Sequence, residues 1–393
     1  MEKNPYRPGA AVQPAYLAGR DEAIRRFTKI LHASPEIPAC IRMTGLRGVG
    51  KSVLLVRMQE EAEASGWLVT RYELEPRHNS EGALAALLTG LAEKGVQRVS
   101  RIARLRQTSE RAARALSWKL SVEDLTISLD PSLTTETSTL TESLLRVTEA
   151  AVDHGKQGYA LLLDEAHSVS DETRAKRSEH PLSMLVAAVN ALQAMGAPIC
   201  LVLCGLPTLR TNLLRARTYT ERMFRGEDVS SLTGELAAQA FSRPLDGGAI
   251  TTTPDLVDAV ISEVDGYPYF IQLWGAELWD AANDAGRSRM DRSLLDDMRG
   301  HILERLDRDF HEGRVASLTP AEQDLLLASA GCSYPPLKVA DLRRHTNKDD
   351  PYVNVLMGRL VEAGVVYRVA KGQYRYTAPQ FHEYLQRRVL PYM

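Results

Sequence analysis

The segment GLRGVGKS, residues 45–52, has the residue types and the spacing that binding of a phosphate group requires. Its glycines let the backbone curl so that several N–H groups face one point, and a following helix would add a partial positive charge there. Lys51 is expected to reach the β- and γ-phosphates of a nucleotide, and the Ser52 hydroxyl is expected to bind Mg²⁺. The predicted nucleotide contacts are Gly45, Arg47, Gly48, Val49, Gly50, Lys51, Ser52 and Val53.

A second group of chemically active residues lies further along the chain, in YALLLDEAH, residues 159–167. An apolar strand that ends in two carboxylates is a Walker B motif. Asp164 is predicted to hold Mg²⁺ opposite Ser52, and Glu165 to orient or deprotonate the attacking water. We interpret His167 as a packed or surface histidine rather than a catalytic one. Together the two motifs predict binding and hydrolysis of ATP.

These residues need a parallel sheet to bring them together. An apolar strand is predicted at residues 39–44, a helix at 51–65 and a further strand at 67–74, an order typical of parallel sheets. The continuous apolar runs at 159–163 and 197–205 suit strands that are buried on both faces. We therefore expect an α/β P-loop NTPase core with helices on both faces of a parallel sheet.

The rest of the chain divides by composition. Residues 1–20 are rich in Pro and Gly and are expected to form an arm near the nucleotide, ahead of an ATPase core at 21–234. Residues 235–315 have an all-helical pattern and are predicted to form a lid. In residues 316–393, three helices are followed by two short strands, a pattern typical of a winged-helix domain.

Bulk composition argues against several classes of protein. Of the 393 residues, 44% are hydrophobic and 25% are charged, so disorder is not expected. The net charge of −2 gives no overall signal for nucleic acid or a membrane surface. The sequence has no apolar run long enough to span a membrane and no signal peptide at its start. The four cysteines lack the spacing of metal ligands, and a cytoplasmic protein is expected.

Two segments are nevertheless basic. Residues 331–393 contain ten Lys/Arg residues against five acidic ones. The helix expected at 351–363 is mostly apolar, which is unusual for a helix that contacts base edges, so DNA-backbone contact and protein interaction are both open. The predicted helix at 98–119 has seven basic residues and one acid, which fits a DNA-tracking helix, a solvated face or a contact to an acidic partner. After it, residues 118–131 predict a hairpin.

In their order along the chain, these motifs resemble the AAA+/STAND class of P-loop ATPases. Within that class, the likeness is to bacterial ATP-binding proteins related to the archaeal and eukaryotic origin-recognition ATPases. The segments NPYRPG (4–9) and YLAGRDEAI (16–24) resemble the N-terminal box that packs on adenine. The resemblance implies adenine contacts by Tyr16, Leu17, Gly19 and Arg20.

Two later segments extend the resemblance. LVLCGLPTL, residues 201–209, resembles the strand and turn that carry sensor 1. Cys204 and Gly205 stand where replication initiators place Asn, and Thr208 is the candidate substitute. TYTERMF resembles the segment whose arginine is directed at a neighbour's nucleotide, which implies that Arg222 is an arginine finger in trans. A surface salt bridge is the alternative role for Arg222.

The segment DGYPYFIQLWG, residues 265–275, resembles the GxP motif of STAND proteins. The resemblance implies that Pro268 contacts the adenine or the β-phosphate region of the nucleotide. Origin-recognition ATPases place a sensor 2 arginine near here, and no arginine stands next to GYP in this sequence. This difference favours a switch-like STAND ATPase.

Three functional interpretations follow, all with ATP or ADP and Mg²⁺ as ligands. The first is a nucleotide-driven switch that engages a protein partner or self-assembles as a homo-oligomer. The second is a DNA-binding or DNA-remodelling ATPase similar to replication initiators or transposition ATPases. The third is a scaffold that binds nucleotide without hydrolysis, against which the intact Asp164 and Glu165 argue.

Overall fold

The computed structural model describes residues 3–9, 11–105, 135–174 and 177–389. The chain forms two compact units. The α/β unit consists of Arg20–Gly45 and Lys51–Val229. The C-terminal unit consists of Met1–Gly19, Leu46–Gly50 and Ser230–Met393. The chain therefore passes from one unit to the other and back within the glycine loop.

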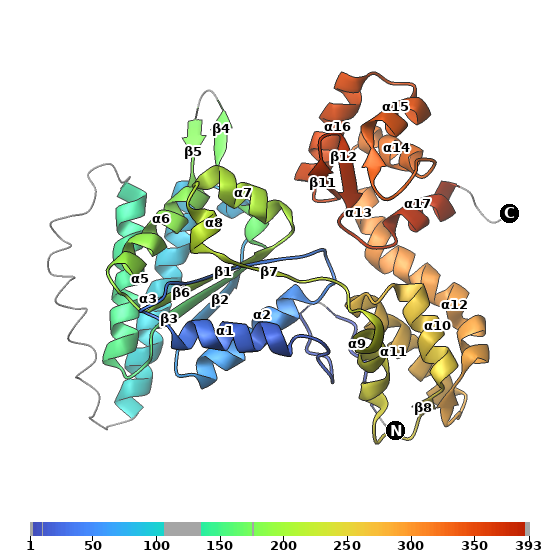
Figure 1. Cartoon of the computed structure of the whole chain (residues 1–393), viewed down its shortest axis with the longest axis horizontal. Helices are drawn as coiled ribbons and strands as arrows, with labels where there is room; N and C mark the ends of the chain where they lie inside the picture. The colour runs from blue at the N-terminus through green and yellow to red at the C-terminus, as the bar shows by residue number, and fades with distance from the viewer. Residues whose placement is uncertain (1–2, 10, 106–134, 175–176, 390–393) are drawn as a thin grey trace. The chain divides into compact units, whose positions relative to one another are not determined.

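The α/β unit is built on a five-stranded parallel sheet with the strand order β2-β3-β6-β1-β7 (Figure 1). The strands are β1 (Ala39–Thr44), β2 (Leu68–Glu73), β3 (Tyr159–Asp164), β6 (Ile199–Gly205) and β7 (Arg225–Asp228). Every residue of β3 and β6 is buried, which explains their continuous apolar sequence. Because the strands are parallel and in register, the carboxyl ends of β1, β3 and β6 meet at one edge.

Helices cover both faces of this sheet (Figure 1). On one face, α2 (Lys51–Ala64) contacts β2, β3 and β6, and α1 (Asp21–His32) packs beside it. On the other face, alternate residues of β3 and β6 share a core with α3 (Glu81–Leu105), α5 (Thr135–Asp153) and α6 (Pro181–Ala194). The predicted α/β fold is confirmed.

Some short elements of the α/β unit have no clear pattern in the sequence. The edge strand β7 has the sequence RGED and is mostly exposed, so it lacks the apolar alternation that indicates a strand. The remaining elements are η1 (Pro76–His78), η3 (Ala166–Ser168), the antiparallel pair β4 (Glu172–Arg174) and β5 (Arg177–Glu179), α7 (Thr208–Ala216) and α8 (Thr220–Met223).

The first part of the C-terminal unit is mainly helical. Its elements are α9 (Gly234–Ser242), η4 (Arg243–Leu245), β8 (Thr251–Thr252), α10 (Pro254–Val264), α11 (Pro268–Asp284), β9 (Arg289–Met290) and α12 (Arg292–Leu306). The all-helical expectation misses the parallel pair of β8 and β9, because two-residue strands leave no periodic pattern. After α12, a π-helix, η5 (Asp307–Glu312), leads into the short α13 (Gly313–Ala316).

The last part of the C-terminal unit has its own apolar core. Its helices are α14 (Pro320–Ser329), α15 (Val339–Thr346), α16 (Asp350–Glu362) and α17 (Phe381–Val389). Its antiparallel sheet has the order β10-β12-β11, with β10 (Leu337–Lys338), β11 (Val366–Ala370) and β12 (Gln373–Tyr376). Three helices and two strands were expected, so α17 and β10 are additional elements.

Two expectations from the sequence fall partly or wholly outside the described residues. The predicted basic helix at 98–119 is described only up to Leu105, within α3. Its remainder and the predicted hairpin at 118–131 lie outside the described residues. Within the described part of the chain, no helix is both long and apolar enough to cross a membrane.

Candidate active site

The glycine loop starts directly after β1, at a point that is held by both neighbouring strands. The Thr44 hydroxyl donates to Asp228 Oδ1 at 2.7 Å, and the N–H of Val229 donates to the Thr44 carbonyl at 2.7 Å. The next N–H, that of Gly45, donates to the carbonyl of Gly205 at 3.2 Å. The start of the loop is therefore fixed to the carboxyl ends of β6 and β7.

Two glycines give the loop its turn. Gly48 has a φ of +80° and Gly50 a φ of +92°, values that residues with a side chain rarely adopt. α2 begins directly after this turn, at Lys51, which is only 6% exposed. Ser52 and Val53 follow in the first turn of α2. A glycine turn, a helix N-terminus and an adjacent lysine together form a phosphate-binding geometry.

The two predicted carboxylates stand at the end of β3. Asp164 is 4% exposed, and its Oδ1 accepts the N–H of Glu165 at 2.9 Å. Glu165 has a φ of +51°, a left-handed conformation that is uncommon for a residue with a side chain and that occurs at functional sites. Its Oε2 lies 3.2 Å from Nδ1 of His167. His167 is thus packed against the carboxylate that is predicted to position water.

Cys204, at the sensor 1 position of the resemblance, lies beside Asp164. The thiol is fully buried, and this burial raises its pKa well above the usual value. The Asp164 carboxylate, to which the thiol is hydrogen-bonded, raises the pKa further, whereas Lys51 opposes the shift. A neutral thiol is therefore hydrogen-bonded to the Asp164 carboxylate, at the position where the replication initiators of the resemblance place asparagine.

The residues after Cys204 bring the sensor region close to His167. A Cβ atom on Gly205 would lie 3.0 Å from the backbone nitrogen of His167, so the close approach of the two segments depends on this glycine. Thr208, the candidate sensor residue, is the first residue of α7. One turn later, the Nδ2 of Asn212 donates to the His167 carbonyl at 3.4 Å. Asn212 was not predicted, although it shares a helix face with Thr208.

In the C-terminal unit, the GYP segment contacts the glycine turn. Gly266 has a φ of +62°, and a Cβ there would lie 1.8 Å from a backbone carbonyl oxygen, so only glycine fits. Pro268 is the first residue of α11, a position that tolerates proline well. The N–H of Tyr269 donates to the Gly48 carbonyl at 3.2 Å. A Cβ on Gly48 would lie 2.8 Å from Cε1 of Tyr267.

The predicted adenine contacts lie in both units. The Tyr16 hydroxyl donates to Gln239 Oε1 of α9 at 3.1 Å, and Leu17 follows it in the arm. Gly19, with a φ of +65°, ends the arm. Arg20 begins the α/β unit, where burial lowers its pKa and Glu227 opposes that shift. Their contact with adenine stays a prediction.

Arg222 lies on the surface of the α/β unit, in α8. Its guanidinium forms no ion pair with any residue that the structure describes. The surface salt bridge considered as its alternative role is therefore not found there. Its action on a neighbour's nucleotide stays a prediction.

The predicted Mg²⁺ ligands are chemically suited to that ion, because a hydroxyl and a carboxylate are the hard oxygen donors that Mg²⁺ prefers. Ser52 lies in the first turn of α2, and Asp164 ends β3. Among the described residues, no group of three or more His, Cys, Asp or Glu side chains could hold a metal alone.

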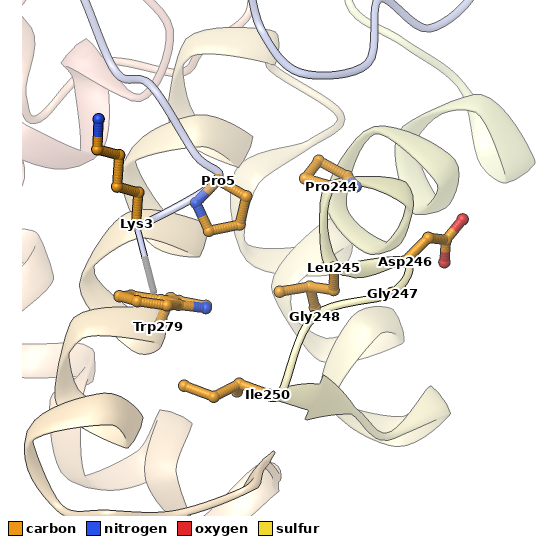
Figure 2. A pocket seen from close by; sticks show the side chains of 9 residues that line it. All are labelled: Lys3, Pro5, Pro244, Leu245, Asp246, Gly247, Gly248, Ile250 and Trp279. Atoms are coloured by element: carbon orange, nitrogen blue, oxygen red, sulfur yellow. The ribbon is translucent and has the colours of Figure 1, made fainter. Parts of the chain in front are cut away.

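A separate hollow of about 160 Å³ lies in the C-terminal unit, between the arm and the helices it covers (Figure 2). Figure 2 shows the apolar side chains of Pro5, Leu245, Ile250 and Trp279 around it. The charged ends of Lys3 and Asp246 point away from each other there. None of the residues that line this hollow belongs to the glycine loop, residues 45–52.

Two protein-family models match parts of the chain. Residues 16–202 match a family model described as AAA ATPase domain. Residues 308–385 match one described as Domain of unknown function (DUF8462). No curated protein matches the chain in a sequence comparison.

Solved structures of similar fold cover nearly the whole chain. A Walker-type ATPase of Pyrococcus abyssi has a TM-score of 0.56 and 17% identity, over 94% of this chain and 96% of that one. The Aeropyrum pernix ORC2 protein, solved as ADPNP–ADP complexes, has a TM-score of 0.54 and 13% identity, over 96% of each chain. At these identities the likeness concerns the fold. Residues 16–202 thus match an AAA ATPase domain, and with its α/β fold, glycine loop and paired carboxylates the chain is a P-loop ATPase.

Proposed function

We propose that this ATPase is a nucleotide-dependent switch, in which ATP binding and hydrolysis change the conformation of the C-terminal unit. In this proposal, the changed surface engages a partner protein or a second copy of the chain. The proposal rests on where the glycine loop makes its hydrogen bonds. Besides the bond from Tyr269 to Gly48, the N–H of Arg47 donates to the carbonyl of Thr377 at 3.3 Å.

These bonds link the phosphate loop to two parts of the C-terminal unit. Tyr269 belongs to α11, and Thr377 follows β12 in the last part of the chain. A phosphate that enters the loop would compete for the Arg47 N–H and reorient the Gly48 peptide. A change from ATP to ADP would therefore directly alter backbone hydrogen bonds in both parts of the C-terminal unit.

In this proposal, residues of the α/β unit carry the chemistry. The Lys51 ammonium neutralises phosphate charge, and Glu165 orients the attacking water and accepts its proton. Ser52 and Asp164 would hold Mg²⁺, which when bound would supply further neutralisation of phosphate charge. The Cys204 thiol holds the Asp164 carboxylate in place. Water then attacks the γ-phosphate, the bond to the bridging oxygen breaks, and ADP and phosphate leave.

Hydrogen exchange tests the switch. The amides of Arg47 and Tyr269 are measured with ADP and with a non-hydrolysable ATP analogue. We expect their protection to differ by about tenfold or more between the two states, which corresponds to one lost hydrogen bond. In Lys51→Ala, which should not bind nucleotide, the difference should vanish. Equal protection in both states of a wild-type protein that hydrolyses ATP would refute the switch and leave the ATPase intact.

A second proposal is that the last part of the C-terminal unit is a winged helix that contacts DNA. Its support is a basic hairpin: Arg368, Lys371 and Arg375 are all exposed around the β11–β12 turn. Against base recognition, α16 exposes the apolar side chains of Tyr352 and Val355, 42% and 55% accessible. Backbone contact without sequence preference is therefore the form of DNA binding that this surface favours.

ATP hydrolysis with and without double-stranded DNA, at low and moderate salt, tests this second proposal. Contact with DNA phosphates predicts stimulation that weakens steeply as salt increases. Replacement of Lys371 and Arg375 by Gln should then reduce the stimulation and its salt dependence, without change in hydrolysis in the absence of DNA. If the rate of ATP hydrolysis is the same with and without DNA at all salt concentrations, the DNA proposal is excluded and the switch that engages a protein partner remains.

A further inference from the structure

Three side chains beside the glycine turn end in polar or charged groups that form no hydrogen bond or ion pair with the residues that the structure describes. Tyr267 is 2% exposed, and its hydroxyl has no hydrogen-bond partner within the described residues. The guanidinium of Arg314, in α13, is half-buried, and that of Arg47 lies in the turn itself. Neither arginine forms an ion pair in the part of the chain that the structure describes. Buried polar groups without partners are costly, so they indicate a place for a ligand.

The three groups lie near one another. Cε1 of Tyr267, the atom that would stand 2.8 Å from a Cβ on Gly48, is bonded to the ring carbon that carries the hydroxyl. Burial, and next the positive charge of Arg47, lower the pKa of the Arg314 guanidinium to about 10, while Tyr267 opposes the shift. Two guanidiniums that repel each other beside a buried hydroxyl form a setting that favours an anion.

The π-helix η5 positions Arg314 at the turn. Its residue Phe310 stacks on Tyr269, with ring centres 5.1 Å apart and an angle of 21° between the rings. Cζ of Phe310 would lie 3.7 Å from a Cβ on Gly48, and Cζ of Arg314 lies 4.3 Å from the centre of the Phe310 ring. One aromatic ring thus lies beside the glycine turn and supports the arginine.

The acidic residues of η5 do not neutralise Arg314. Asp307 accepts from Arg387, with Nε at 3.0 Å from Oδ2. Asp309 pairs with Arg305 at 3.3 Å. Glu312, the third acidic residue of η5, forms no ion pair with Arg314 within the described residues either, so the charge of Arg314 is available to an anion from outside the protein.

We propose that Arg314, Arg47 and the Tyr267 hydroxyl form an anion site that binds a phosphate group of the nucleotide held at the glycine loop. This proposal rests on nucleotide binding at that loop, as set out above. The guanidiniums and the phenol donate hydrogen bonds to phosphate oxygens, an arrangement for which arginine is well suited. Arg314 would thereby supply the positive charge that no arginine next to GYP provides.

Titration of ATP and ADP onto the full chain tests the site. The variants are Arg314→Gln, Tyr267→Phe and the control Arg308→Gln, whose side chain is 67% exposed on the same π-helix. We expect Arg314→Gln to weaken binding of at least one nucleotide about tenfold or more, since a charged hydrogen bond is lost. Tyr267→Phe should weaken it about threefold, since a neutral hydrogen bond is lost. Arg308→Gln should leave both affinities within about twofold of wild type.

Melting temperatures without nucleotide separate binding from folding. Tyr267→Phe removes only an unpartnered hydroxyl, so its melting temperature should equal or exceed that of wild type while its nucleotide affinity falls. Unchanged affinity for both nucleotides in Tyr267→Phe and Arg314→Gln would overturn the site. A wild-type protein that binds no nucleotide would instead overturn the proposed function, and this site with it.

Discussion

The glycine loop joins two regions with different charged groups. In the α/β unit, the carboxylates of Asp164 and Glu165 and the ammonium of Lys51 all act on the buried Cys204 thiol. In the C-terminal unit, the groups near its turn are the guanidiniums of Arg47 and Arg314 and the hydroxyl of Tyr267. The acidic region is suited to hold a metal ion and to position water, and the basic region to meet phosphate charge. Different substitutions should therefore damage turnover and nucleotide binding separately.

The sharpest way to test this division is Glu165→Gln in the acidic region. Turnover should fall about 100-fold or more, because a general base is lost, while ATP affinity stays within about threefold. Steady-state hydrolysis and calorimetric titration measure the two quantities. Glu60→Gln, on the exposed face of α2, is the control and should hydrolyse normally. Normal turnover in Glu165→Gln would remove this residue from the chemistry.

A second prediction concerns acid sensitivity, which should be concentrated in the C-terminal unit. His311 of η5 is fully buried with neither ring nitrogen hydrogen-bonded within the described residues. Burial, with smaller contributions from Arg314 and Arg387, lowers its pKa to about 3. Between pH 6.5 and 3, the unfolded chain would bind a proton here that the folded chain does not. Stability should therefore fall with falling pH, by at most about 1.4 kcal/mol per pH unit.

The variant His311→Phe should lose that part of the acid sensitivity. Phenylalanine retains the ring that stacks on Tyr384 but cannot take up a proton. Melting temperatures of both proteins at pH 7 and pH 5 measure the effect. Wild type should lose more stability than the variant between these values. Equal losses would show that another group controls the acid response.

The two glycines of the turn give a smaller contrast. Both Gly48→Ala and Gly50→Ala should cost about 1–2 kcal/mol, because both backbones have positive φ. In Gly48→Ala the added Cβ would also clash with the buried ring of Tyr267, whereas a Cβ on Gly50 would have no atom within 4 Å. Gly48→Ala should therefore have the lower melting temperature without nucleotide. Equal melting temperatures would mean that the turn does not depend on contact with the GYP segment.

The smallest expected effect is at Cys204. Cys204→Ala removes the hydrogen bond to Asp164 and should slow hydrolysis several-fold, on the order of 1 kcal/mol, whereas Cys204→Ser should stay closer to wild type. Cys200→Ala is a matched control, because this cysteine is buried in the same strand but lies near Cys40 rather than Asp164. If both alanine variants slow hydrolysis equally, packing rather than the hydrogen bond is responsible.

The sequence predicted those parts of the molecule that local patterns determine. The strand expected at 39–44 is β1, and the apolar run before Asp164 is β3, because long apolar segments and glycine turns act locally. The edge strand β7 could not be predicted, because its four residues are mostly polar. The electrostatic interaction between Tyr267 and Arg314 could not be predicted either. This interaction depends on the path of α11, α12 and η5, and no residue pattern in the sequence predicts a π-helix.

The π-helix η5 makes the position of Arg314, the proposed phosphate ligand, sensitive to the length of the chain that precedes it. A π-turn behaves as an α-helix into which one residue has been inserted, and one residue turns a side chain about 100° around the helix axis. Loss of a single codon between Leu306 and Gly313 would leave the glycine loop and both carboxylates untouched. It would nevertheless rotate Arg314 away from the turn. In this protein, a one-residue deletion far from every motif would thus remove a proposed phosphate contact while it leaves the catalytic carboxylates in place.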